Sequence, residues 1–367
     1  MNDASKKKGA GGNGAGVNGA GVNGAGTGAR RRRAAARPAG RRPAPVVNLA
    51  LQGGGSHGAF TWGVLDRLLE DGRLGFEGVS GASAGAMNAA VMAHGWSLDG
   101  RDGARAALER FWHAIGGVAG PFGHAAAGPW AELFSRALSP YQFNPINLNP
   151  LRTILLDQVD FERLRAVRGL HVFVSATHVR SGHVRVFHTG ELSVDVLLAS
   201  ACLPTVFQAV EIDGEPYWDG GYVADPPLFP FFYECDTRDL LVVMVNPLTR
   251  DAVPRTPMDI LDRVNEISFN ASLIAEMRAI AFVQKLIGEG WLRPAYRARL
   301  KDVRVHVVRA DASLAGLGTD TKFVTALPFL LDLRDRGRRA ADAWLAQALP
   351  DVGVRSSVDP RATFLGS

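Results

Sequence analysis

The feature that most constrains the fold is an alternation of short apolar runs with longer amphipathic stretches, separated by glycines. Residues 46–52 form a short apolar run that leads into three glycines, which is typical of a buried strand that feeds a turn. Residues 59–70 place apolar side chains along one helical stripe. A second short run at 76–80 and an Ala- and Met-rich stretch at 84–94 repeat this order. The pattern predicts an α/β fold with a mainly parallel sheet.

The rest of the chain continues this pattern except for one irregular stretch. Residues 96–150 hold aromatic side chains among glycine and proline breakers, and they are either an insertion over a functional site or ordinary peripheral helices. The other expected elements are a strand hairpin at 170–176 and 184–188, a helix at 193–201, a strand and turn at 210–217, a strand at 240–245, a helix at 258–288, a strand at 303–308 and a helix at 324–347.

The first 45 residues differ in composition from everything that follows. Residues 9–28 repeat Gly, Ala and Asn with almost nothing to bury, so residues 1–45 are expected to be a disordered tail. Residues 1–46 hold ten Lys or Arg and one acid, a net charge of +9; because the whole chain is +5, the remainder is −4. The body therefore offers no basic face to nucleic acid. The tail is either simply solvated or a peripheral contact for anionic lipid surfaces.

The cysteines and the apolar runs indicate a reduced, cytoplasmic protein. Cys202 and Cys235 lie far apart, without the spacing of a metal site. We find no secretory signal and no apolar run of about 18 residues that could span a membrane. No metal ligand set is visible, and no cofactor is needed for the chemistry inferred below.

The first motif with chemical meaning is GASAG, a GxSxG pattern between a predicted strand and a predicted helix. Gly81 and Gly85 flank Ser83 and permit a sharp turn in which a Cβ would clash. That turn exposes the serine hydroxyl at a helix N-terminus, where free N–H groups favour a developing oxyanion. In isolation such a motif is often only a turn of small residues, but here the strand–helix context is the one that a nucleophilic serine requires.

The second motif is a glycine-rich loop directly after the first strand. Gly53, Gly54 and Gly55 permit their backbone N–H groups to point into one concavity, which suits either a phosphate or an oxyanion. Together with Gly58 they also match GxGxxG, the dinucleotide fingerprint, and Glu77 lies about where a ribose-binding acid would fall. The loop alone leaves both readings open.

The third motif is an Asp-Gly-Gly sequence that follows the expected strand and turn at 210–217. Asp219 precedes Gly220 and Gly221. This is a common turn signal, yet an aspartate held rigidly by two glycines also suits the base that accepts a serine proton.

In this order and spacing the three motifs resemble the patatin-like phospholipase family over residues 46–245, including the ASACLP segment at 199–204. The resemblance implies a patatin-like three-layer α/β sandwich with a mainly parallel sheet and a nucleophile elbow. It also implies a carboxylic ester hydrolase, of phospholipase or lysophospholipase type, that acts on lipid esters. We expect residues 46–245 to be the catalytic domain and residues 246–367 to be a helical extension packed on it.

The resemblance also assigns roles to individual residues. Ser83 corresponds to the family's nucleophile and Asp219 to the base that partners it. The backbone N–H groups of Gly53, Gly54 and Gly55 correspond to the oxyanion hole.

The chain departs from the family pattern in two places, and neither affects the serine and the aspartate. Many relatives carry Arg or Lys within the glycine-rich loop, where this chain has Ser56 and His57. The family pattern Asn-x-Pro after the aspartate is replaced here by Asp225-Pro226-Pro227.

Histidines define one alternative mechanism, a Ser–Asp–His triad. After Asp219 the chain has one histidine, His306, which lies within a strand-like run and is therefore expected to be structural. His57 precedes the serine and is expected to line the loop or cap its helix. Two further alternatives are a dinucleotide-binding oxidoreductase and a non-catalytic lipid-associated protein that binds through its basic tail.

Overall fold

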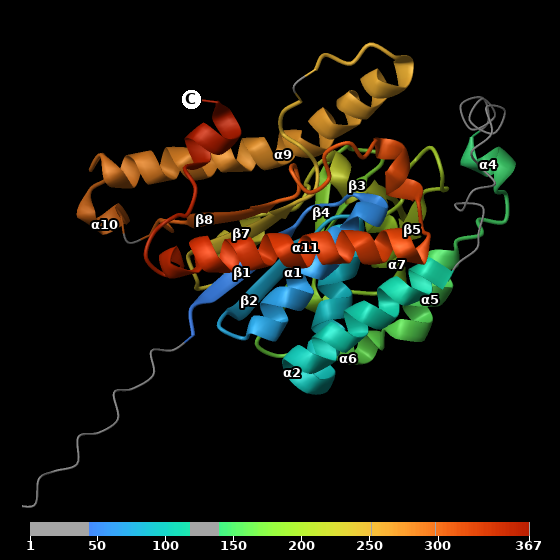
Figure 1. Ribbon diagram of the computed structural model, residues 1–367, viewed down its shortest axis with the longest axis horizontal. Coiled ribbons are helices and arrows are strands. Elements are labelled where there is room, and N and C mark those ends of the chain that lie inside the picture. The colour runs from blue at the N-terminus through green and yellow to red at the C-terminus, as the bar shows by residue number, and fades with distance from the viewer. Residues whose placement is uncertain (1–43, 118–138, 251, 298, 367) are drawn as a thin grey trace, which may run out of the picture. The chain divides into compact units, whose positions relative to one another are not determined.

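A mainly parallel β-sheet forms the centre of the folded unit (Figure 1). The computed structural model describes residues 44–117, 139–250, 252–297 and 299–366. The strands are β1 (Val46–Leu51), β2 (Gly75–Gly81), β3 (His171–His178), β4 (Val184–His188), β5 (Val210–Ile212), β6 (Glu215–Asp219), β7 (Asp239–Met244) and β8 (Arg304–Arg309).

The strand order in the sheet is β5-β6-β3-β2-β1-β7-β8, and β4 pairs with β3. Neighbours from β3 through β2, β1 and β7 to β8 run parallel, whereas β4 and β6 pair antiparallel with β3, and β5 with β6. The predictions of a mainly parallel sheet and of the β3–β4 hairpin are confirmed. Leu51 at the end of β1 lies beside Gly81 at the end of β2. The loops that follow these two strands therefore emerge at the same edge of the sheet.

The helices are α1 (Gly58–Asp71), α2 (Ala84–Gly117), α4 (Pro140–Phe143), α5 (Pro150–Gln158), α6 (Phe161–Arg165), α7 (Val194–Ser200), α8 (Phe229–Glu234), α9 (Pro257–Gly288), α10 (Pro294–Arg297) and α11 (Leu327–Gln347). Single turns lie at η1 (Gly55–His57), η2 (Thr189–Glu191), η3 (Gly220–Tyr222), η4 (Thr319–Phe323), η5 (Leu349–Asp351) and η6 (Arg361–Leu365). Within the described residues, no helix is both long and apolar enough to cross a bilayer.

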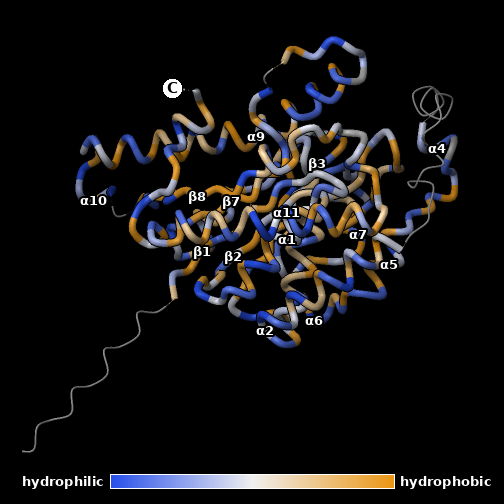
Figure 2. Tube along the Cα trace, viewed as in Figure 1, coloured by the Kyte–Doolittle hydropathy of each residue, from blue (hydrophilic) through white to orange (hydrophobic). Residues whose placement is uncertain are grey.

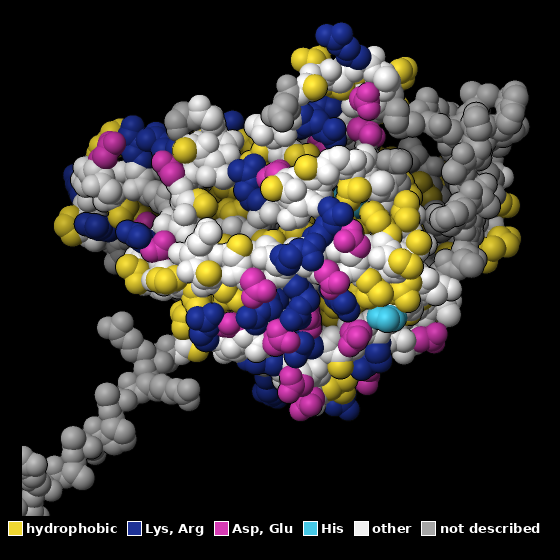
Figure 3. All heavy atoms as spheres, in the orientation of Figure 1, with side chains coloured by type: hydrophobic (Ala, Val, Ile, Leu, Met, Phe, Trp, Pro, Cys, Tyr) yellow, Lys and Arg dark blue, Asp and Glu magenta, His cyan; other side chains and the backbone are white. Residues whose placement is uncertain are grey.

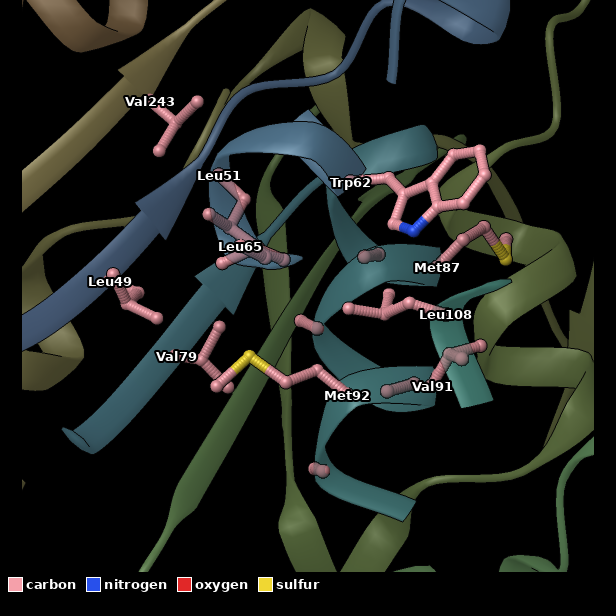
Figure 4. Close-up of a cluster of buried hydrophobic side chains, with 14 of the residues drawn as sticks. Leu49, Leu51, Trp62, Leu65, Val79, Met87, Val91, Met92, Leu108 and Val243 are labelled. Carbon is pink, nitrogen blue, oxygen red and sulfur yellow. The ribbon is translucent and has the colours of Figure 1, made fainter. Parts of the chain in front are cut away.

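Apolar side chains of the strands alternate between the two faces of the sheet, as the period of a strand requires. In β1, Leu49 and Leu51 join a cluster with α1, α2 and α11, whereas Ala50 joins a second cluster with α8 and α9. Figure 4 shows the first cluster, in which Trp62 of α1 lies beside Met87 of α2; Trp62 also stacks on Trp112 of α2. The hydropathy colouring places the apolar strands between more polar helices (Figure 2). The predicted three-layer arrangement is therefore confirmed.

Helices α1, α2 and α11 come from distant parts of the sequence, and ion pairs join them on the face that points away from the sheet. Asp66 of α1 accepts a hydrogen bond of 2.8 Å from Arg105 of α2 and another from Arg338 of α11. Positive and negative side chains are intermixed over this face (Figure 3). The last long helix thus belongs to the same layer as the first, and β8 lies at the edge of the same sheet.

The first part of the irregular stretch at 96–150 is helical, which agrees with the alternative of helices there. Helix α2 continues past residue 94, with a break at Asp99 and Gly100. The buried residues beyond the break are Ala104, Ala107, Leu108, Phe111 and Trp112. The glycines that resemble breakers permit close packing instead, because a Cβ on Gly103 would lie 2.3 Å from the Gly95 carbonyl oxygen.

Two expectations concern residues outside the described ranges. The disordered basic tail with its contact to anionic lipid is one, and the alternative of an insertion over the site at 96–150 is the other, as far as it concerns residues 118–138. Both remain predictions, as does the division of the folded part at residue 245.

Candidate active site

Ser83 lies in a sharp turn between β2 and α2, as the GxSxG pattern predicts. Its φ is +52°, a conformation that costs a non-glycine residue about 1–3 kcal/mol. The Ser83 N–H donates to the backbone oxygen and the hydroxyl oxygen of Ser200, each at 3.0 Å. A Cβ on Gly81 would lie 2.4 Å from the Gly85 backbone, and one on Gly85 would lie 2.1 Å from the Leu51 carbonyl oxygen. Both glycines are therefore required for the strand, turn and helix to pack this closely.

Asp219 ends β6 and is held by its backbone. Its N–H donates to the Cys202 carbonyl at 2.8 Å, and its carbonyl accepts from the Thr177 hydroxyl at 2.7 Å. Its side-chain Oδ1 accepts the Gly221 N–H at 2.8 Å. Gly220 and the Ser175 carbonyl are so close that a Cβ would lie 2.2 Å from that oxygen. The carboxylate consequently has little freedom to change its direction.

The second carboxylate oxygen of Asp219 is the unusual feature of the site. Asp219 is 1% exposed, and among the described residues its Oδ2 accepts no hydrogen bond of normal geometry. Burial raises the pKa of Asp219 to about 7, while the Gly221 N–H and the nearby Ser83 hydroxyl partly offset that rise. A buried acceptor without a partner, beside a serine hydroxyl, is suited to take a proton from it.

The glycine-rich loop runs alongside the serine. A Cβ on Gly53 would lie 3.0 Å from the Ser83 Cβ. The Gly53 N–H donates to Asp225 Oδ1 at 2.5 Å, so it is already engaged. Within the described part of the chain, the N–H groups of Gly54 and Gly55 donate to no acceptor. Of the three predicted oxyanion donors, two are thus unoccupied and one has a carboxylate partner.

Asp225 is a site residue that the sequence analysis noted only as a departure from a family pattern. It is fully buried, and burial raises its pKa well above the usual range, which the Gly53 N–H offsets in part. Its backbone N–H donates to the Ser272 hydroxyl at 3.0 Å. Its position six residues after Asp219 is the only sequence signal that could have drawn attention to it.

The two histidines considered in the sequence are each bonded to a residue other than Ser83. His57 Nε2 contacts the Thr321 hydroxyl at 2.7 Å, and burial followed by the charge of Lys322 lowers the pKa of His57 to about 3. His306 is fully buried and bonds Asp239 Oδ1 at 3.0 Å. Because Asp239 begins β7, this pair lies toward the opposite end of the parallel strands from the loop after β1.

Glu77 does not occupy the place of a ribose-binding acid. It lies in the first half of β2, and its carboxylate accepts the backbone N–H groups of Asp236 and Thr237 at 2.5 and 2.7 Å. A dinucleotide binds beyond the carboxyl ends of such strands. The position of Glu77 therefore does not support the hypothesis that the glycine-rich loop binds a dinucleotide.

A cavity of about 250 Å³ opens beside Cys202, whose carbonyl holds the Asp219 backbone. Its walls come from α5, α7 and the loop before β5 and include Leu198, Phe207 and Arg152. Among the described residues, no cluster of three or more His, Cys, Asp or Glu side chains could hold a metal ion.

Comparison with known proteins gives one family match and a set of similar folds. The family model described as patatin-like phospholipase matches residues 49–232, which include all three motifs. Among solved structures, VipD from Legionella pneumophila is similar, with 18% sequence identity and a TM-score of 0.37 over 82% of this chain and 67% of that chain. A search of curated proteins finds no match.

Proposed function

Because the chain belongs to the patatin-like phospholipase family, a family of lipid ester hydrolases, we propose that it cleaves carboxylic esters of lipids through a Ser83–Asp219 dyad. The observation that carries this proposal is the Asp219 carboxylate, which is buried beside the Ser83 hydroxyl and has one oxygen that accepts no hydrogen bond of normal geometry from the residues that the structure describes. Phospholipids, lysophospholipids and acylglycerols are the substrates that the proposal includes.

In the first half of the reaction, the Ser83 Oγ attacks the acyl carbonyl carbon while its proton passes to Asp219 Oδ2. The carbonyl π electrons move to the oxygen, and the Gly54 and Gly55 N–H groups donate to the resulting oxyanion. The N-terminus of α2, where Ser83 lies, adds its positive dipole. When the tetrahedral intermediate collapses, Asp219 returns the proton to the leaving alcohol oxygen, and an acyl-enzyme remains.

In the second half, water attacks the acyl-enzyme while Asp219 accepts a proton from it. The second oxyanion occupies the same donors, and its collapse releases the carboxylic acid and restores the Ser83 hydroxyl. The Gly53 N–H is bound to Asp225 and has no direct part in this scheme.

Labelling with a fluorophosphonate tests the nucleophile directly. We expect one adduct per chain on the peptide that contains Ser83, and no adduct in Ser83→Ala, because the phosphonate reacts with an activated serine Oγ. Ser56→Ala, which removes the serine of the glycine-rich loop, is the matched control and should label fully. Mass spectrometry of the digested protein gives the site. An adduct that persists in a folded Ser83→Ala protein would refute the assignment.

The pH dependence of kcat/KM tests the base. Asp219 must be ionised to accept the proton, and burial raises its pKa to about 7. The rate should therefore fall about tenfold per pH unit as the pH decreases below 7 and should level off above it. His57, with a pKa of about 3, remains neutral throughout, so His57→Asn should keep the inflection. A rate that is constant from about pH 5 to pH 9 would contradict the assignment of Asp219.

A further inference from the structure

A lysine from the C-terminal part of the chain lies against the glycine-rich loop. Lys322 belongs to η4, between β8 and α11. Its carbonyl oxygen lies so near Gly55, whose φ is +56°, that a Cβ there would approach it to 2.4 Å. The Lys322 ammonium is buried, although part of the residue is exposed, and burial lowers its pKa. The loop itself, residues 53–58, contains no Lys or Arg.

A chain of hydrogen bonds leads from this ammonium to the loop. Lys322 Nζ donates to Asn246 Oδ1 at 2.7 Å, and Asn246 Nδ2 donates to the Gly53 carbonyl at 3.0 Å. The Gly53 N–H donates to Asp225 Oδ1 at 2.5 Å. Asn246 Nδ2 also approaches Asp225 Oδ2 at 3.5 Å. Both polar backbone groups of Gly53 are thus held by buried side chains.

The lysine favours the observed orientation of the Asn246 side chain. An ammonium donates only, so it selects the Oδ1 atom of an amide and turns the Nδ2 group away from itself. The Asn246 backbone is fixed separately, because its N–H donates to Gln52 Oε1 at 2.9 Å. The Gly53 carbonyl and Asp225 Oδ2 favour the Nδ2 group on their side, and the lysine adds a third contact that holds the amide in the same orientation. The cation therefore strengthens the hold of Asn246 on the loop.

We propose that Lys322 is a positioning residue: through Asn246 it fixes the Gly53 peptide and so aims the Gly54 and Gly55 N–H groups at the oxyanion. The inference deepens the proposed ester hydrolysis and rests on it. Lys322 acts through Asn246, without contact with the substrate. Lys322 lies more than 260 residues farther along the chain than the loop that it would position.

Lys322→Met tests the proposal, because it keeps the length of the side chain and removes both donor and charge. We expect kcat for a short-chain ester to fall about 10- to 100-fold, with KM changed less than about threefold, since misaligned oxyanion donors affect the transition state more than substrate binding. Lys322→Arg, which keeps a cationic donor, should recover most of the loss. A folded Lys322→Met protein with the wild-type kcat, or an arginine variant no better than methionine, overturns the proposal.

Lys301→Met is the matched control for a lysine with a purely structural role. Lys301 Nζ donates to the Phe231 carbonyl at 2.8 Å and to the Cys235 carbonyl, away from the loop. This variant should lose stability and keep kcat. If Lys322→Met does not fold, Asn246→Ala tests the next link and should give the same loss of kcat at nearly constant KM. Wild-type kcat in a folded Asn246→Ala protein likewise overturns the proposal.

Hydrogen exchange separates this inference from the ester hydrolysis on which it rests. Exchange at the amides of residues 52–58, measured by mass spectrometry, should be at least about tenfold faster in Lys322→Met than in the wild-type protein. In Lys301→Met the exchange rate should equal that of the wild type. Both results are expected whether or not any ester is cleaved. Absence of turnover in the wild-type protein would refute the proposed function alone. Unchanged exchange in Lys322→Met, with normal wild-type turnover, would refute the role of Lys322 alone.

Discussion

Asp219→Asn is expected to lower kcat for a short-chain p-nitrophenyl ester by about 10²- to 10⁴-fold, which is what general-base assistance contributes. Asparagine keeps the shape of the side chain and an acceptor for the Gly221 N–H, which lies 2.8 Å from Oδ1 in the native site. An amide does not accept the serine proton. The variant should therefore fold normally and bind substrate normally while the chemical step fails.

Measuring kcat and KM for Asp219→Asn, Ser83→Ala and the double variant, with circular dichroism to verify folding, tests the dyad as a unit. Effects within such a unit are not additive, so the double variant should be little slower than either single variant. Asp213→Asn makes the same change in the exposed turn between β5 and β6 and should retain wild-type kcat. A folded Asp219→Asn protein that retains kcat would eliminate the dyad mechanism.

His306→Ala is expected to destabilise the protein by about 3 kcal/mol while leaving kcat nearly unchanged. His306 is fully buried, and it joins Asp239 and the Ser357 hydroxyl, each at 3.0 Å. Removing one partner of a buried polar pair leaves the other without compensation. Arg304 at 2.9 Å still pairs with Asp239, so the loss stays at the low end of the range for such pairs.

Urea unfolding of His306→Ala measures the loss of stability, and kcat is measured well below the unfolding transition. His183→Ala, which alters an exposed histidine after β3, should change neither quantity. If a folded His306→Ala protein lost activity as severely as Asp219→Asn, a triad would have to replace the dyad.

The order of helices and strands could be predicted from the sequence because the helix and strand periods are local properties. The turn around Ser83 could be predicted for the same reason. Its strand, turn and helix are consecutive in the chain, so one short motif contains all the glycines that the turn requires. The sequence left residues 96–150 open between an insertion and helices, because a glycine in a helix can serve either as a breaker or as a point of close packing. Only the partner that packs against it distinguishes the two.

By itself the sequence determined the alternation of strands and helices, the parallel sheet and the positions of the three glycine-containing motifs, because each follows from residues that are neighbours in the chain. Tertiary structure alone decided what those motifs touch. It buries Asp219 Oδ2 without a hydrogen bond of normal geometry from any described residue, pairs the Gly53 N–H with Asp225, and brings Lys322 to the loop through Asn246. The physical reason is that the burial and the hydrogen-bond partners of a side chain depend on which distant segments lie beside it at the edge of the sheet. A local sequence pattern contains no information about those distant neighbours.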